Sequence, residues 1–445
     1  MKRRTLLVGG GAAGAAAVGG FALRHRLARM VKRWTRSSEF TATPPLLPHD
    51  PHTERRTIAV ARGLGSIDAR VDDVLAKSAL DTTIGDDDVV IIKVAAQWWN
   101  QGMTNVAAAK RVIEHILARP GFTGEIVVFE NTHFRLANGS GLARAFTRPS
   151  ERNVDVPGWK TLGDLALSYR DHPRVSFVGL IDAAPSELAD DPWHDPSHEH
   201  GVYGGDGRGP IAAGEAARDG MRWDFERAFE LKRGWFETSR TPLSWPVFSS
   251  PKSRVRIDLR DGLVGVPSRK LTWISLVTVN EHGSTGMTAC CKSAMGVLDM
   301  SCGRFGTDPR TDGYQSVHYF GNPEATWRMA GPLAHFARQV RKPDLYVAIA
   351  EWVAVAPPGF SDEKDVRLEA DSAHRAQTIV AGTDPVAIDA YCAKHVLLPI
   401  ARSIGAPAAD DLDLDRPDAK TTKFLRYYRE VGFTGTLDES LVTIV

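Results

Sequence analysis

The feature of this sequence that most constrains its fold is a pair of β-branched runs separated by a helix-length segment. Val89–Ile92 and Glu125–Phe129 are almost wholly apolar, which is typical of strands that are buried on both faces. Residues 106–118 between them have the periodicity of a helix. A strand, a helix and a strand at this spacing predict a right-handed crossover. We therefore expect the α/β fold class, with a central, largely parallel sheet and helices on both faces.

The remaining apolar runs extend this pattern along most of the chain. They predict strands at 57–61, 271–279, 345–349 and 379–380, and helices at 71–79 and 385–396. Residues 186–256 break the pattern because they are rich in Trp, Pro and Gly, and we expect an irregular insertion there. The expected organisation is a leader at 1–36, a Pro- and His-rich linker at 37–56, and one α/β domain at 57–445.

Charge is distributed unevenly along the chain. Nine of the 55 Lys and Arg residues lie in 1–36, a segment without acids, which leaves 46 basic against 54 acidic residues elsewhere, a net charge of −8. Nucleic acids are bound chiefly through clustered cations that contact phosphates. An acidic body therefore excludes nucleic acid as an expected partner.

The leader has the layout of an export signal. Lys2, Arg3 and Arg4 precede an uncharged Gly- and Ala-rich stretch from Thr5 to Leu23, which resembles a twin-arginine signal. The glycines in this stretch also fit a nucleotide-binding loop, but no strand precedes them and no ribose-binding acid follows at the required spacing. We therefore expect the twin-arginine export machinery as a partner.

The segment after the signal combines cations with an apolar stripe. Residues 24–36 place Leu27, Met30, Val31 and Trp34 at helical spacing among Arg and Lys residues. Such a helix suits an anionic membrane surface, and docking on the body is the alternative. The expected location is the periplasm or cell envelope, with membrane anchoring if the leader remains uncleaved.

Four elements of the body carry a resemblance to a known family. They are the strand end Val90–Lys93, the segment Thr288–Gly296, the strand Pro343–Glu351, and TDPVAIDA at Thr383–Ala390. In this order they resemble the domain-of-unknown-function 362 family, with its elements I-K-P-N, T-G-A-x-K-N-x-x-G and T-D-P-V-A-x-D-A. The resemblance implies an α/β domain whose chemistry is unsettled.

This chain also departs from the family pattern. Val94 and Ala95 replace Pro-Asn, Ser293 replaces Asn, and Glu351 stands where the family has Asp. Either lost activity or changed specificity would account for these differences. Some relatives carry an iron–sulfur module, but the chain has no C-x-x-C run. We therefore expect no iron–sulfur cluster.

Polar residues at the predicted strand ends define a candidate pocket. Because ligands in parallel sheets bind at the carboxyl ends of strands, we expect a small-molecule ligand there. The candidate catalytic residues are Lys93, Glu130, His133, Lys292, Glu351 and Asp389, with His318 as a weaker candidate. Lysines with carboxylates suit proton transfer on an anionic substrate, and the alternative is that both lysines form structural ion pairs.

A second set of residues is predicted to bind substrate. Thr285, Gly286 and Thr288 precede an expected helix, where a turn could bind an anion. Asp384 completes the set, although its position before Pro385 also suits a helix cap.

The insertion contains the residues that best suit a metal. His194, His198 and His200 alternate with carboxylates, a donor set for a divalent transition metal such as zinc, nickel or copper. A solvated polar loop is the alternative. The sequence thus leaves two functions open, an envelope enzyme with a strand-end pocket and a non-catalytic protein that binds a metal or small molecule.

Overall fold

The computed structural model describes residues 54–63, 65–130, 144–179, 220–233, 237–298, 317, 327–361, 364–432 and 434–445. The larger of two compact units contains the described residues of 44–229 and 240–445. The smaller unit includes residues 230–233 and 237–239. Most of the predicted leader and linker, His133, His318 and the cluster at 194–200 lie outside the described residues.

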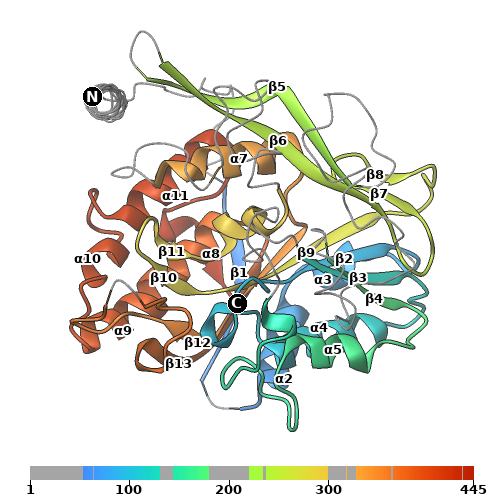
Figure 1. The fold of residues 1–445 in the computed structure, drawn as a ribbon, viewed down its shortest axis with the longest axis horizontal. Helices are drawn as coiled ribbons and strands as arrows, with labels where there is room; N and C mark the ends of the chain where they lie inside the picture. The colour runs from blue at the N-terminus through green and yellow to red at the C-terminus, as the bar shows by residue number, and fades with distance from the viewer. Residues whose placement is uncertain are drawn as a thin grey trace, which may run out of the picture. The chain divides into compact units, whose positions relative to one another are not determined.

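An eight-stranded sheet forms the centre of the larger unit (Figure 1). Its order is β14-β1-β13-β12-β9-β2-β3-β4, and every neighbouring pair is parallel except the two made by β13. This confirms the predicted α/β class and its largely parallel sheet. The strands are β1 (Arg56–Arg62), β2 (Val89–Lys93), β3 (Glu125–Glu130), β4 (Val175–Gly179), β9 (Leu271–Thr278), β12 (Leu345–Ala354), β13 (Ala373–Gly382) and β14 (Val442–Ile444).

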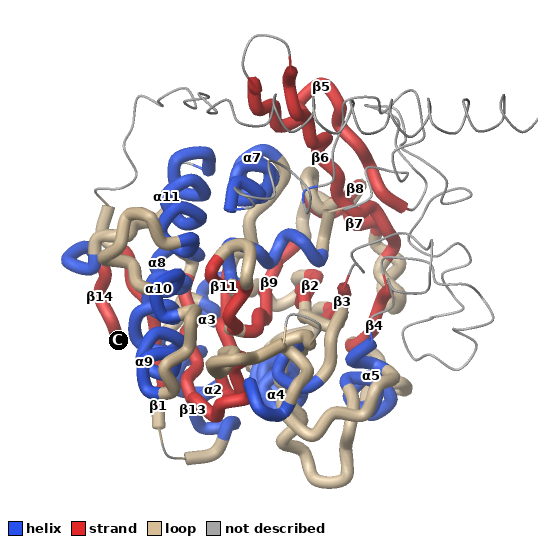
Figure 2. Tube along the Cα trace, turned by 60° about the vertical axis from the view of Figure 1, so that its left-hand side comes forward, coloured by secondary structure: helices blue, strands red, loops and turns tan. Residues whose placement is uncertain are grey.

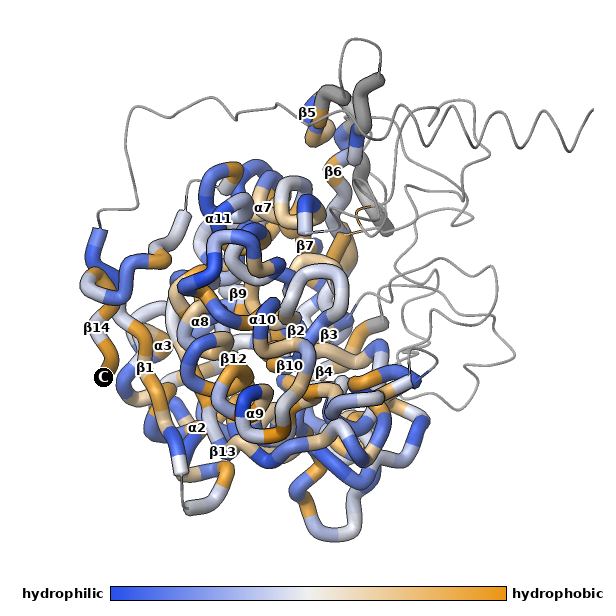
Figure 3. Tube along the Cα trace, turned by 90° about the vertical axis from the view of Figure 1, so that its left-hand side faces the viewer, coloured by the Kyte–Doolittle hydropathy of each residue, from blue (hydrophilic) through white to orange (hydrophobic). Residues whose placement is uncertain are grey.

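One face of the sheet is covered by α2 (Ile67–Lys77), α4 (Val106–Leu117) and α5 (Leu162–Ser168) (Figure 2). Side chains alternate along a strand, so Val90 and Ile92 of β2 face these helices, where they join one hydrophobic cluster. Helix α2 is amphipathic, and Figure 3 shows both hydrophobic and hydrophilic residues along its tube.

Helices and a second sheet cover the opposite face. Val89 and Ile91 of β2 join a cluster with residues of α7 (Ala330–Gln339), α8 (Pro385–Cys392) and α11 (Lys420–Gly432). The second sheet has the order β5-β6-β7-β8. Its strands are β5 (Gly220–Arg233), β6 (Glu237–Ser249), β7 (Arg256–Asp258) and β8 (Gly262–Val264).

This second sheet corrects the prediction of an irregular insertion at 186–256. From residue 220 onward the described part of that segment is largely regular β structure. Strand β6 packs against β3 through Trp245, Val247 and Phe248. The ring centroids of Phe129 and Phe248 are 6.4 Å apart. The aromatic residues are therefore core residues of the interface between the two sheets.

The other elements are short. The α-helices are α3 (Leu80–Thr83), α9 (Leu398–Ser403) and α10 (Ala409–Leu412), and the hairpin is β10 (Asn280–His282) with β11 (Gly286–Thr288). The 3₁₀ turns are η2 (Asn100–Gly102), η3 (Arg144–Phe146), η4 (Cys290–Gly296), η8 (Ala370–Ser372) and η10 (Glu439–Leu441), and η9 (Ala393–Leu397) is a π-helical turn. Within the described residues, no helix is both long and apolar enough to span a membrane.

Candidate functional site

Two adjacent strand ends bring a lysine and a glutamate together. Lys93 ends β2 and pairs in register with Phe129, so Glu130 lies one residue further along β3. The Lys93 Nζ and Glu130 Oε2 atoms are 3.2 Å apart, and both side chains are buried. Burial raises the pKa of Glu130 to about 7, although the Lys93 ammonium opposes the shift. Glu130 is therefore able to gain or lose a proton near neutral pH.

The turn η4 packs directly against this pair. A Cβ atom at Gly296 would lie 2.5 Å from Cε of Lys93 and 2.7 Å from both carboxylate oxygens of Glu130. The ends of the Lys93 and Glu130 side chains would have to shift to admit it, so glycine allows η4 to approach the pair this closely. The same turn carries Lys292 and Ser293 toward the strand ends.

Asp389 holds η4 in place from helix α8. Its Oδ1 atom accepts the backbone N–H of Cys290 at 2.8 Å, and its Oδ2 atom accepts that of Cys291 at 2.9 Å. Burial raises the pKa of Asp389 to about 6, with these two hydrogen bonds acting in the opposite direction. Asp389 was predicted to be catalytic, but its contacts are those of a residue that positions Lys292.

Lys292 is buried without a carboxylate partner in the described part of the chain. Burial, together with the nearby Arg367 guanidinium, lowers the pKa of Lys292 well below its usual range. The hydroxyl oxygen of Thr288, which lines the same cavity, is buried and has no hydrogen-bond partner among the described residues. Buried polar groups without partners are uncommon and call for an explanation.

Aromatic residues hold two guanidinium groups at the other side of the site. Arg144 lies over the ring of Trp98, 5.5 Å from its centroid, and over that of Trp99 at 5.9 Å. Arg367 lies 4.6 Å from the centroid of Trp98. Stacking of this kind orients a guanidinium while leaving its N–H groups able to bind a ligand.

The loop that carries Arg367 is fixed by amide side chains of η2. The Asn100 side chain donates to the carbonyl of Leu368 at 2.9 Å, and Gln101 donates to that of Val366 at 3.0 Å. Within the loop, the Asp365 carboxylate accepts two hydrogen bonds from the guanidinium of Arg367, at 2.8 and 2.7 Å. Arg367 thus has an internal counter-charge.

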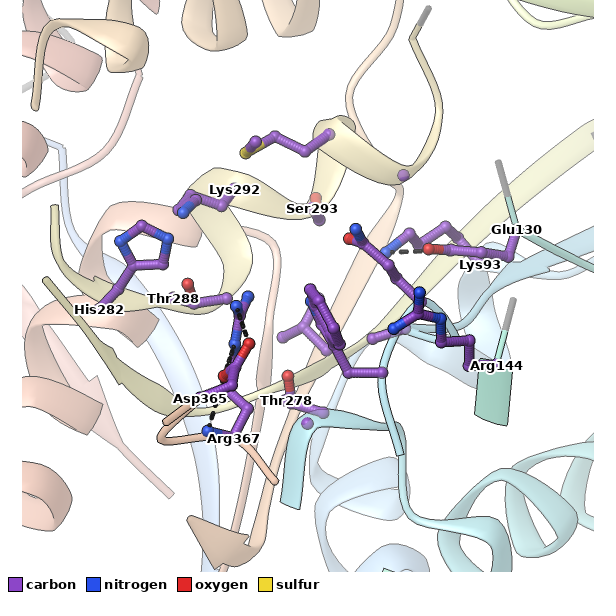
Figure 4. Close-up of a pocket in the computed structure, with 17 residues that line it drawn as sticks. Lys93, Glu130, Arg144, Thr278, His282, Thr288, Lys292, Ser293, Asp365 and Arg367 are labelled. Carbon is purple, nitrogen blue, oxygen red and sulfur yellow. Dashed lines mark hydrogen bonds and ion pairs between the residues drawn. The ribbon is translucent and has the colours of Figure 1, made fainter. Parts of the chain in front are cut away.

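The Lys93–Glu130 pair, Lys292, Thr288, Trp98, Arg144 and the Asp365–Arg367 pair line one cavity of about 390 Å³ (Figure 4). Four cationic side chains (Lys93, Arg144, Lys292 and Arg367) and two carboxylates (Glu130 and Asp365) line it, so the cations are in excess. A second cavity of about 570 Å³ shares His282, Asp365 and Arg367 with the first. The first cavity, at about 390 Å³, has a volume that suits a small molecule.

Several predicted residues lie elsewhere. Glu351 was expected in the pocket but does not line it. Instead its Oε2 atom is 2.6 Å from the Arg70 guanidinium of α2, in a buried pair, and Arg375 lies 3.5 Å from its other oxygen. Strand β12 continues to Ala354, with an irregularity between Ala350 and Trp352 that contains Glu351. The residue is therefore not at a strand end.

Two of the three residues predicted to form an anion-binding turn lie away from the cavity. Thr285 and Gly286 belong to the hairpin of β10 and β11, where the Thr285 hydroxyl donates to the carbonyl of Met287 at 2.7 Å. Gly286 has a φ of +79° and packs against Thr421. Of these three residues, only Thr288 lines the cavity.

Asp384 caps a helix, which was the alternative interpretation of its sequence position. Its Oδ1 atom accepts the N–H groups of Val386 and Ala387 at the start of α8, and its Oδ2 atom accepts that of Thr436. It does not line the cavity.

Metal binding at His194, His198 and His200 remains untested because they lie outside the described residues. The part of the chain that the structure does describe contains no group of His, Cys, Asp and Glu side chains able to hold a metal ion.

Comparison with known proteins locates a family segment. Residues 271–394 match the family model of the domain of unknown function DUF362. A search of curated proteins found no match. One solved structure, a Thermotoga maritima protein determined by a structural genomics consortium, shares 12% sequence identity at a TM-score of 0.30. That alignment covers 71% of this chain and 57% of the other.

The DUF362 segment supplies much of the cavity wall. It contains Lys292 and the Asp365–Arg367 pair, whereas Lys93, Glu130, Trp98 and Arg144 precede it. The sequence did not indicate Trp98, Arg144, Asp365 or Arg367 as site residues, since all four lie in loops or turns. The sequence carried one indication for two of them: Trp98 follows the end of β2, and Arg144 follows the end of β3.

Proposed function

We propose that the cavity binds a small anionic molecule and that the protein is an enzyme that moves a proton on it. The observation that carries this proposal is the excess of cations in the cavity, with Lys292 and Arg144 lacking carboxylate partners among the described residues. Burial disfavours the charged form of Lys292, and an anionic ligand supplies the counter-charge that favours its ammonium. Thr288 offers a hydroxyl with no other partner.

Glu130 is the group that would transfer the proton. Its pKa of about 7 matches neutral pH, which is the condition under which an acid–base catalyst works best. Lys93, at 3.2 Å, stabilises the carboxylate form after Glu130 gives up its proton. In this scheme, Lys292 binds and orients the substrate, and Asp389 positions Lys292 through η4.

Two measurements on matched variants test this proposal. We expect Lys292→Met to weaken binding of phosphate and small carboxylates at least tenfold in titration calorimetry. We expect Glu130→Gln to retain binding but to abolish exchange of carbon-bound protons with deuterated water, followed by NMR over a panel of carboxylates. Binding that is equal in wild type and Lys292→Met would contradict the proposal.

We also propose that the chain is exported by the twin-arginine route and stays in the cell envelope. Support comes from the Arg3–Arg4 pair and the uncharged stretch that follows it. Replacing both arginines by lysine should leave the protein in the cytoplasmic fraction. Unchanged export of that variant would refute this route.

A non-catalytic metal-binding role is the second candidate, because three imidazoles fall within His194–His200. Elemental analysis of protein purified without metal affinity tests it. Under this proposal, a near-stoichiometric transition metal is lost when the three histidines become alanine. Metal content that does not change would remove the candidate.

A further inference from the structure

We propose that the ligand of this cavity carries two anionic groups, one bound by Lys292 and the other by Arg144, joined by an apolar middle. The inference rests on the proposed function and specifies its substrate class. It follows from how the cavity's cations are neutralised. Lys93 is paired with Glu130, and Arg367 is paired with Asp365. The other two cations, Lys292 and Arg144, have no such partner in the described part of the chain.

The unpaired cations come from different elements and different sides. Lys292 extends from η4 and Arg144 from η3, and Figure 4 shows them on opposite sides of the cavity. Residues 131–143, which directly precede Arg144, contain neither Asp nor Glu. A single anionic group could neutralise one of these cations. A ligand with two anionic groups, one at each side of the cavity, would neutralise both.

The two ends have different donor geometry. At the first end, the buried ammonium of Lys292 lies with the unpartnered hydroxyl of Thr288 in the cavity wall. At the second end, the guanidinium of Arg144 is oriented by Trp98 and Trp99. A guanidinium presents a planar fork of N–H donors that matches a carboxylate or a phosphate.

The wall of the cavity is partly apolar. Val277, Met295 and Trp98 line it, and Ala95 adds a small side chain. The indole N–H of Trp98 is buried and has no hydrogen-bond partner among the described residues, so it offers one donor to the ligand. A compact dicarboxylate, or a carboxylate joined to a phosphate by a short carbon chain, satisfies the charge and the volume of about 390 Å³.

Titration calorimetry with dicarboxylates and their half-amides tests the inference. Each half-amide keeps the shape of its parent but has one charge fewer. The panel runs from succinate to suberate, with terephthalate as a rigid member. The chain length in this series varies the distance between the two carboxylates, so the tightest binder shows which distance fits the cavity. For the best-fitting member, we expect the dicarboxylate to bind at least tenfold more tightly than its half-amide.

Variants assign the two charges. Lys292→Met and Arg144→Gln should each weaken binding of the dicarboxylate at least tenfold. Its affinity for each variant should then be close to that of the half-amide for wild type. Arg148→Gln is the control for Arg144, because Arg148 also lies over Trp99, at 6.0 Å, but does not line the cavity. Lys364→Met is the control for Lys292, since Lys364 lies outside this cavity and pairs with Asp371. Both controls should bind like wild type.

The outcomes separate this inference from the function on which it rests. Equal affinity for every dicarboxylate and its half-amide, with Lys292→Met weakening both, would overturn only the two-anion inference. Failure of wild type to bind any member of the panel or phosphate would overturn both. Circular dichroism confirms that each variant is folded before its affinity is compared.

Discussion

Two buried ion pairs in this molecule look alike in sequence but differ in their surroundings. In each pair, an almost fully buried glutamate of a strand has one buried cation as its nearest partner, Lys93 for Glu130 and Arg70 for Glu351. The Arg70 guanidinium lies 2.6 Å from its glutamate and also donates to the carbonyls of Gly63 and Gly65. The Lys93 ammonium is further from its partner, at 3.2 Å, and the pair faces a cavity.

The difference shows what separates a structural pair from a reactive one. Arg70 joins α2, the glycine-containing loop before it and β12, so its role is to hold elements together. The pKa of Glu130 is raised to about 7, so its carboxyl group can be neutral beside Lys93. A buried carboxylate of this kind can give up or accept a proton without disrupting the sheet.

Breaking the structural pair should have the largest effect. Replacing Arg70 by Met leaves Glu351 buried with only the half-exposed Arg375, so we expect a loss of about 3–5 kcal/mol of unfolding free energy. Lys93→Met should cost clearly less, because Glu130 can take up a proton when its cation is removed. Urea unfolding of both variants at pH 7 measures the difference. Equal losses would erase the distinction between the two pairs.

The second effect is a pH dependence of stability that belongs to Glu130. Its pKa is raised from 4.5 to about 7 in the folded protein, so between these values the folded state holds a proton that the unfolded state has lost. The stabilisation is complete below pH 4.5 and is lost as pH rises through 7, a change on the order of 3 kcal/mol.

Glu130→Gln removes this titration. The unfolding free energy of wild type minus that of the variant should therefore fall between pH 4.5 and 7 and stay level above 7. Subtracting the variant cancels Asp389, which is present in both proteins. Chemical unfolding at several pH values supplies the curve, and a difference that rises over this range would show the sign to be wrong.

A smaller effect is expected when the Lys93–Glu130 pair is crowded. Ala at Gly296 places a methyl group 2.5 Å from Lys93, so the pair and η4 must shift, which we expect to cost about 1–3 kcal/mol. Anion binding should weaken at the same time. Gly283→Ala is the control because nothing lies within 4 Å of its added methyl group. Calorimetry and thermal melting of both variants provide the readout.

The smallest effect should come from the outer partner of Glu351. The Arg375 side chain is 52% exposed, and its guanidinium is 3.5 Å from the carboxylate. Water screens such contacts, so Arg375→Gln should change stability by about 0–1 kcal/mol. A loss as large as that of Arg70→Met would mean that Arg375, rather than Arg70, holds the carboxylate.

Much of the fold and part of the site could be predicted from the sequence. Val89–Ile92 and Glu125–Phe129 identified strands buried on both faces, and this placed Lys93 and Glu130 side by side at the ends of β2 and β3. Lys292 came from its family element and does line the cavity. Periodicity suffices to place Lys93 and Glu130 because neighbouring parallel strands end at the same sheet edge.

The rest depends on contacts between distant segments. Arg367 reaches the cavity because Asn100 and Gln101 bind the carbonyls of its loop, a pairing that no local pattern encodes. Glu351 was misplaced because β12 runs five residues past the predicted end at Ile349. Asp389 reaches η4 only through the docking of α8, so its role as a positioning residue required the structure.

The position of β1 has a consequence for how the chain is made. Its partners are β13 and β14, both near the carboxyl end, so Ile58 pairs with Gly382 and Ile444. A growing chain on the ribosome carries β1 without a partner until nearly all of the domain has been synthesised. Such late closure slows folding and leaves strand edges exposed to aggregation. Expression should therefore depend on holding factors that bind the nascent chain, and truncations before residue 373 should be insoluble.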